Sequence, residues 1–236
     1  MAAAKYNLKI NYVNVSESFE LDFDHLESLL NKNTKVVSIV GESNMSGMLR
    51  DIKKINSLVK DKTDAVYIVD GAQLVPHRKI DVQDLGIDFL CVSGHKMLGP
   101  TGIGVVWGRK ELLENLDPVY GGGDMIEEVF YDTATWAPIP HKFEAGTPPY
   151  VEAIGLGAAV DYLSNLDMNS VQKHSDDLRE YAKNKLENID GLNIIHTNSK
   201  LAGCTFAMSV DGVHATDVSL MPVSYTHLRA HETSHH

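Results

Sequence analysis

The sequence predicts an α/β fold, in which a mostly parallel sheet is sandwiched by helices and a partial α+β domain follows. Three observations predict it. Strand-like and helix-like segments alternate through the first two thirds of the chain, a pattern that builds parallel sheets covered by helices. Apolar residues in the helix-like segments recur at spacings of three and four, which is the helical period. The 236 residues, of which 43% are hydrophobic and 22% charged, suffice to bury a sizeable core.

The first half of the chain supplies the strands of the expected sheet. The expected strands are 8–13, 34–40, 64–70, 88–94 and 102–108, and the expected helices are 23–32, 48–60 and 109–116. The apolar faces of the first two helices comprise Phe23, Leu26, Leu29 and Leu30 in one and Ile52, Ile55, Leu58 and Val59 in the other. Each set follows the helical spacing, so each helix has one face for the sheet.

Between residues 117 and 150 the periodicity gives way to glycine, proline and aromatic residues. A long segment without regular structure is usually functional, and a disordered linker would contain fewer aromatics, so we expect active-site or interface loops here. The elements expected after it are helices at 151–165 and 168–188, strands at 192–196 and 203–210, and the start of a helix at 214–220. Glycines and alanines in the helix at 151–165 permit close packing.

The chain divides into three parts by this pattern. We predict a large α/β domain over 1–165, a partial small α+β domain over 166–220, and a non-native tail over 221–236. The tail lacks periodicity and holds four of the eleven histidines, which are His227, His231, His235 and His236. Clustered imidazoles bind divalent ions, but we favour a non-native addition and exclude the tail from the fold.

Composition excludes several classes of function. The formal net charge of −11 argues against sequence-independent binding of nucleic acid, which needs a basic face. No stretch approaches the length of an apolar membrane span, and the N-terminus lacks the features of a signal peptide, so a cytoplasmic protein is expected. Cys91 and Cys204 both lie in apolar runs and are predicted to be buried core thiols, neither metal ligands nor nucleophiles.

Two residues at expected strand ends point to a chemistry. Asp70 closes the run VYIVD, and Lys96 follows the run DFLCVSGH. Pyridoxal phosphate requires such a pair: a lysine amine forms a Schiff base with its aldehyde, and a carboxylate keeps its pyridine nitrogen protonated so that the ring accepts electrons. Taken alone, a strand-end aspartate is usually a turn residue and a loop lysine a solvated charge. Their combination predicts a pyridoxal phosphate site for amino-acid chemistry.

Neighbouring residues strengthen this prediction. Gln73 can offer its amide to the phenolic oxygen of the cofactor, and Ser93 and His95 can donate hydrogen bonds to its phosphate. No GxxxxGK[ST] loop is present, and the glycine-rich GPTGIG is followed by a strand where a dinucleotide motif requires a helix. The hydrolase motifs GxSxG and HExxH are absent as well.

These residues carry a resemblance to a known family. The stretch VDGAQLVPHRKIDVQDLGIDFLCVSGHKMLGPTGIGVVW, with GGGDMI and FEAGTPP after it, resembles the class V aminotransferases and, within them, the SufS-type (group II) cysteine desulfurases. The resemblance runs from about Tyr6 to Ser219. It implies a fold-type I homodimer that binds pyridoxal phosphate and converts L-cysteine to L-alanine. The sulfur would remain as a persulfide on an enzyme cysteine, for a sulfur-acceptor protein of iron–sulfur cluster assembly.

The resemblance also implies a role for each site residue. Carried over by position, these are the Schiff-base lysine Lys96, the pyridine-nitrogen partner Asp70, the phenolic-oxygen partner Gln73, the phosphate ligands Ser93 and His95, Thr147 on the phosphate of the partner subunit, and Asn44 near the substrate. No metal is implied.

The departures from the family lead to further expectations. Family members begin earlier, with a segment that carries a phosphate loop and a histidine on the cofactor ring, and they continue to a loop with the persulfide cysteine. We therefore expect a chain truncated at both ends that turns over cysteine poorly or not at all. The alternatives are a selenocysteine lyase or another class V enzyme, a non-catalytic truncated chain, and a plain α/β domain that binds another phosphate ligand.

Overall fold

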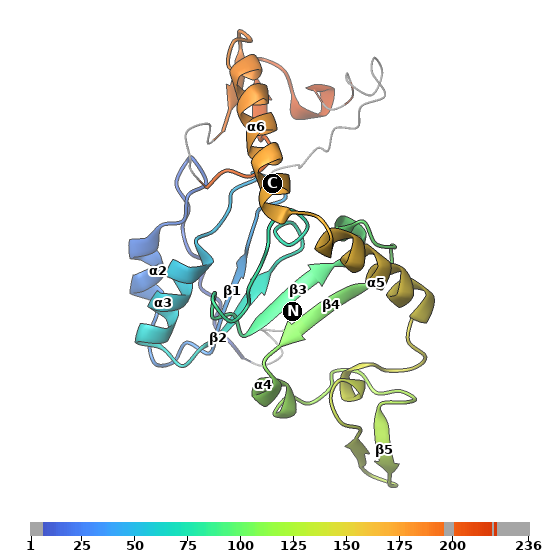
Figure 1. Cartoon of the computed structure of the whole chain (residues 1–236). Coiled ribbons are helices and arrows are strands. Elements are labelled where there is room, and N and C mark those ends of the chain that lie inside the picture. Colours follow the sequence, from blue (N-terminus) through green and yellow to red (C-terminus); the bar gives the residue numbers. More distant parts are fainter. Residues whose placement is uncertain (1–6, 196–200, 219, 221–236) are drawn as a thin grey trace. The chain divides into compact units, whose positions relative to one another are not determined.

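The computed structural model describes residues 7–195, 201–218 and 220, which are drawn in colour in Figure 1. The chain forms two compact units. The sheet unit comprises residues 36–39 and 66–168, and the described residues of the second unit are 7–35, 40–65, 169–195, 201–218 and 220. The described part of the chain contains no helix long and apolar enough to cross a membrane. The predicted domain division at residue 165 stays a prediction, and the histidine-rich tail lies outside the described residues.

A four-stranded sheet is the centre of the sheet unit. Its strands are β1 (Val36–Val40), β2 (Val66–Asp70), β3 (Phe89–Ser93) and β4 (Gly104–Gly108), in that order across the sheet. β2 and β3 are parallel, and β3 and β4 are antiparallel. These strands match four of the strands expected from the sequence, with ends that differ by a few residues. β4 lies at the edge of the sheet, and Val105 and Val106 are exposed on it.

The core of this sheet lies under β2 and β3. Tyr67, Val69 and Ile87 are fully buried, and Leu90 is nearly so. Residues at alternate positions of β2 are buried, as the period of two along a strand requires when one face of a sheet packs against the core. Burial of these side chains ties the two parallel strands together.

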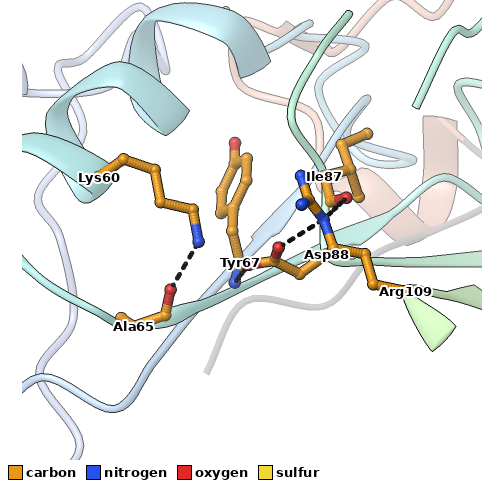
Figure 2. Close-up of polar contacts among 6 residues, drawn as sticks. All are labelled: Lys60, Ala65, Tyr67, Ile87, Asp88 and Arg109. Carbon is orange, nitrogen blue, oxygen red and sulfur yellow. Dashed lines mark hydrogen bonds and ion pairs between the residues drawn. The ribbon is translucent and has the colours of Figure 1, made fainter. Parts of the chain in front are cut away.

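One buried carboxylate joins three strands at the end of the sheet where β2 begins. Asp88 is 4% exposed, and its Oδ2 accepts a hydrogen bond of 2.8 Å from the Tyr67 backbone N–H (Figure 2). The Asp88 backbone N–H in turn donates to the Tyr67 carbonyl. On the other side, Arg109 Nε lies 3.0 Å from Asp88 Oδ1 and also donates to the carbonyl of Ile87. Asp88 therefore links the start of β2, the start of β3 and the end of β4.

The rest of the sheet unit consists of helices and a small hairpin. They are α4 (Lys110–Glu114), the hairpin strands β5 (Ile126–Val129) and β6 (Ala134–Trp136), the 3-10 turn η2 (His141–Phe143) and α5 (Tyr150–Ser164). The segment expected to lack regular structure thus contains a two-stranded antiparallel sheet. The strands are only four and three residues long, and exposed aromatic residues lie between them. The alternation that identifies strands in a sequence is therefore not visible here.

The second unit contains the helices α2 (Phe23–Leu29), α3 (Ile52–Lys62) and α6 (Met168–Leu186) and the antiparallel pair β7 (Leu192–Ile194) and β8 (Met208–Val210). Aspartates cap two of the helices: Asp22 accepts from the His25 N–H, and Asp51 accepts from the Lys54 N–H. The second cap explains why α3 begins at Ile52 and not at the expected residue 48.

Contacts between side chains fix α2 and α3 to each other. Lys62 Nζ lies 2.7 Å from Glu27 Oε1, and Lys54 Nζ lies 3.6 Å from the centre of the Phe23 ring. At the end of α3, Lys60 Nζ donates to the carbonyl of Ala65 (Figure 2). These two helices therefore form the local framework of the second unit.

The strand expected at residues 8–13 is wrong. The structure shows no regular element there, and Leu8, Ile10 and Tyr12 are each more than half exposed. Their alternation with polar residues fits a strand pattern, but alternation forms a strand only when a neighbouring strand accepts its backbone hydrogen bonds. No strand of the described residues pairs with this segment.

Replacing Asp88 tests the link between the three strands. We expect Asp88→Ala to lower the free energy of unfolding by about 2–4 kcal/mol, because it leaves the Tyr67 N–H without its acceptor and the Arg109 guanidinium without its carboxylate. Urea unfolding followed by circular dichroism measures this. The exposed Asp132 provides the control, since Asp132→Ala should change stability by less than about 0.5 kcal/mol. Equal stabilities of the two variants would contradict a structural role for Asp88.

Candidate active site

Asp70 is the last residue of β2 and lies beside Cys91 of β3 in the parallel register. The carboxyl ends of both strands therefore meet at one edge of the sheet, where ligands bind in open α/β sheets. Asp70 is exposed, and its Oδ1 accepts a hydrogen bond of 2.9 Å from the Ala72 N–H. This local bond holds the carboxylate at the strand end.

Gly71 keeps the chain against β3 just past the end of β2. Its N–H donates to the Cys91 carbonyl over 2.8 Å. A Cβ atom at this position would lie 2.7 Å from Leu90 Cδ1 and 2.9 Å from Val75 Cγ2, so no larger residue fits without movement. The turn that follows contains Gln73, which is half-buried.

Lys96 lies in a closed turn directly after β3. The turn is η1 (Gly94–Met97), and it is bounded by hydrogen bonds from the Gly94 N–H to the Ile103 carbonyl and from the Gly99 N–H to the Gly94 carbonyl, each of 3.0 Å. Lys96 is half-buried, and no residue that the structure describes forms a hydrogen bond or an ion pair with its amine. The amine is therefore available for a covalent bond.

Ser93 and His95 flank the first residue of the same turn. Ser93 Oγ and His95 Nδ1 lie 3.0 Å apart and share a hydrogen bond. This bond fixes the imidazole next to the hydroxyl, so the two side chains form one small polar group. The structure thus brings together three of the predicted site residues within four positions of β3 and η1.

The donor set at this edge of the sheet fits pyridoxal phosphate. The cofactor requires an unpaired amine, a carboxylate and donors for a phosphate. Lys96 provides the first, Asp70 the second, and Ser93 with His95 the third, at the ends of two neighbouring strands and in the turn that follows one of them. The chemistry of the residues is therefore compatible with the predicted cofactor.

Thr147 and Asn44 lie elsewhere in the chain. Thr147 is exposed and belongs to the sheet unit, where the Gly146 N–H donates to the Gly123 carbonyl. That bond joins the GGGDMI and FEAGTPP segments, which are far apart in the sequence. Asn44 is exposed in a turn of the second unit in which Ser43 Oγ accepts from the Ser46 N–H. The roles of Thr147 toward a partner subunit and of Asn44 toward substrate stay predictions.

The two cysteines differ from each other. Cys91 is half-buried, and burial together with the neighbouring Asp70 carboxylate raises the pKa of its thiol. A neutral thiol is a weak nucleophile, which agrees with a structural role for Cys91.

The prediction that Cys204 is a buried core thiol is wrong, because this residue is exposed and precedes β8. Around it, the chain packs against another loop: the Gly203 N–H donates to the Gly47 carbonyl, and a Cβ atom at Gly47 would lie within 3.0 Å of Thr205 Cβ. The segment therefore does not pair as a strand until Met208. The glycine just before Cys204 was the sequence signal for this interruption.

One residue next to the site was missed by the sequence reasoning. Leu156 of α5 is buried and contacts η1, the turn that carries Lys96. The small residues of this helix predicted close packing, and Gly155 indeed approaches Pro100 so closely that a Cβ atom would lie 2.6 Å from its Cγ. The small residues in the sequence thus indicated that this helix packs closely against a neighbour, but they did not indicate which segment the neighbour is.

Comparison with known proteins identifies the family. The family description "Aminotransferase class-V" matches residues 1–223, and the chain belongs to this family. It is 39% identical over 217 residues to the cysteine desulfurase of Haloferax volcanii, covering 92% of this chain and 51% of that protein. It is 41% identical over 219 residues to a probable cysteine desulfurase of Streptomyces coelicolor, covering 92% of this chain and 52% of that protein. The chain thus spans about half the length of the curated relatives it matches.

Solved structures of cysteine desulfurases superpose well on this chain. The crystal structure of the cysteine desulfurase CsdA from Escherichia coli superposes with a TM-score of 0.87 at 34% identity, covering 94% of this chain and 55% of that one. The apo cysteine desulfurase from Thermococcus onnurineus gives a TM-score of 0.88 at 30% identity, covering 95% of this chain and 56% of that one. The expected fold, a fold-type I mostly parallel sheet with helices, is confirmed. The SufS-type subgroup stays a prediction.

The raised pKa of Cys91 leads to a test of its contact with Asp70. In Asp70→Asn the negative charge beside the thiol is lost, so the pKa of Cys91 falls and the thiolate fraction at a fixed pH rises. In a Cys204→Ser background, we expect alkylation by iodoacetamide at pH 8 to accelerate about two- to threefold. Asp132→Asn in the same background is the control, and an unchanged rate in Asp70→Asn would show that the carboxylate does not act on the thiol.

Proposed function

We propose that this chain carries the cofactor site of a pyridoxal-phosphate-dependent cysteine desulfurase. The observation that carries the proposal is the position of Lys96, whose amine no described residue binds, in a closed turn at the end of β3, beside the strand that ends in Asp70. Relatives about two fifths identical, named cysteine desulfurases or probable ones, support the choice of reaction within the family.

Each side chain of the candidate site has a defined role in this proposal. Bound pyridoxal phosphate supplies an electron sink for the α-carbon of an amino acid. Lys96 holds the cofactor covalently and moves the proton of the substrate α-carbon. Asp70 keeps a proton on the pyridine nitrogen, and Gln73 donates to the phenolic oxygen. Ser93 and His95, already joined to each other, donate to the phosphate.

The proposed substrate is L-cysteine. Its carbon–sulfur bond breaks, L-alanine leaves, and the sulfur joins an acceptor thiol as a persulfide, so that one thiol and one cysteine give one persulfide and one alanine. Neither Cys91 nor Cys204 matches the loop position that the family resemblance gives to that acceptor. The proposal includes a cytoplasmic homodimer in which Thr147 reaches the partner's phosphate, Asn44 near the substrate, and delivery of sulfur to an iron–sulfur assembly protein.

The cofactor site is tested by trapping. After pyridoxal phosphate is added to the purified chain, we expect an absorbance band above 400 nm and, after borohydride reduction, a stable adduct that peptide mapping places on Lys96. Lys96→Ala should abolish both signals. Lys110→Ala removes an exposed lysine of the same unit and should leave both unchanged. An adduct on other lysines alone would refute the assignment.

The reaction is tested by product analysis. We expect the chain loaded with pyridoxal phosphate to release less than about one equivalent of alanine from L-cysteine, because no cysteine occupies the acceptor position that the family resemblance gives. Sustained release, measured by amino-acid analysis over many equivalents, would contradict this expectation. Parallel incubation with L-selenocysteine distinguishes a desulfurase from a selenocysteine lyase.

A further inference from the structure

One side chain of α5 lies against both ends of the turn that carries Lys96. Leu156 is 7% exposed. A Cβ atom at Gly99 would lie 3.0 Å from Leu156 Cδ1, and a Cβ atom at Gly94 would lie 3.4 Å from the same carbon. A single methyl group of Leu156 therefore fills the space next to both glycines that bound the turn, and Lys96 lies between these glycines in the sequence.

The adjacent residue of the helix makes a second contact with the same loop. Gly155 faces Pro100, which directly follows Gly99, and a Cβ atom on Gly155 would lie 2.6 Å from Pro100 Cγ. α5 therefore holds two successive points of the loop. The glycine lets the helix backbone approach, and the leucine fills the space beneath the turn.

Packing from α5 adds to the hydrogen bonds of the turn itself. The turn consists of four residues in a 3-10 conformation, and the N–H groups of Leu98 and Gly99 both donate to the Gly94 carbonyl. It ends at Leu98, a non-glycine residue with a φ of 63°, in the left-handed region that costs free energy for side chains other than glycine. A short strained turn of this kind persists where packing from outside holds it.

We propose that Leu156 is a positioning residue for Lys96, which acts by holding the turn η1 closed. Leu156 contacts neither cofactor nor substrate in this assignment, and its effect passes through Gly94 and Gly99. Loss of its methyl groups opens the turn and so releases the residue that carries the amine from its fixed place after β3. The inference rests on the proposed function only for the role of Lys96; the packing of Leu156 on the turn is independent of it.

The first test needs no cofactor. Hydrogen exchange at the Gly99 amide reports opening of the turn, because that N–H closes it. We expect Leu156→Ala to accelerate this exchange by about tenfold or more, since a buried leucine is replaced by a cavity. Exchange at the Tyr67 amide, which is bonded to buried Asp88, monitors the rest of the sheet and should not change.

Three further variants of α5 complete the set. Leu156→Met keeps the reach of the side chain and should restore slow exchange. Ile154→Ala removes the same number of carbons from a residue of the same helix that is 74% exposed, and it should behave as the wild type. If Leu156→Ala does not fold, Leu156→Val, which lacks the δ carbons that reach the glycines, replaces it in every comparison.

The second test uses pyridoxal phosphate. The rate at which the borohydride-trapped adduct forms on Lys96 should fall about tenfold in Leu156→Ala and stay within about twofold of the wild type in Leu156→Met and Ile154→Ala. The inference is overturned if Leu156→Ala matches Ile154→Ala in both measurements, or if Tyr67 exchange accelerates as much as Gly99 exchange. If the wild-type chain forms no adduct, the proposed function fails, while Gly99 exchange still decides whether Leu156 holds the turn.

Discussion

The parallel register of β2 against β3 is the constraint on which the candidate site depends. It pairs Val69 with Leu90 and Asp70 with Cys91, so the strand that ends in a carboxylate runs beside the strand that leads into the lysine turn. A slip of one residue would turn every side chain of β2 to the other face, taking Val69 out of the core and Asp70 away from the edge. Asp88 opposes such a slip from the far end, because both its side chain and its backbone bond to Tyr67. Asp88 thus fixes the register at the opposite end of β2 from the candidate site.

The candidate site also depends on close packing of the backbone at the carboxyl ends of β2 and β3. A Cβ atom on Gly71 would collide with Leu90 of β3 and with Val75, and Cβ atoms on Gly94 and Gly99 would press against Leu156 of α5. Glycines at these positions bring the strand ends and the turn into contact with their supports, where any side chain would separate them. Lys96, in the turn between Gly94 and Gly99, is half-buried, and no described residue binds its amine. Close packing of the backbone and an amine without a described partner therefore occur at the same edge.

Much of the sheet could be predicted from the sequence, and less of what surrounds it. The strands that contain Tyr67 and Leu90 are apolar runs between turn residues, and this pattern is sufficient to identify them. Residues 8–13 show the same alternation without a partner strand, which a local pattern cannot reveal. The exposure of Cys204 follows from the packing of Gly203 on Gly47, two residues far apart in the sequence. Asp70, Ser93, His95 and Lys96 could be proposed as site residues because strand ends are visible in a local pattern, whereas Leu156 meets the candidate site only through tertiary structure. The roles of all the predicted site residues, Gln73, Thr147 and Asn44 included, stay predictions.

The antiparallel pairing of β3 with β4 has a consequence for how the chain folds. Ser93 pairs with Gly104, so the connection that carries Lys96 returns directly to its neighbouring strand as a hairpin does. The connection from Asp70 at the end of β2 to the start of β3 is longer than the connection from β3 to β4. Closing the shorter loop costs less chain entropy, and contacts between residues near in sequence form fastest. We therefore expect the turn that carries Lys96 to form first during folding. The β2 strand that ends in Asp70 would pair with β3 in a later step, so the two parts of the candidate site would form one after the other.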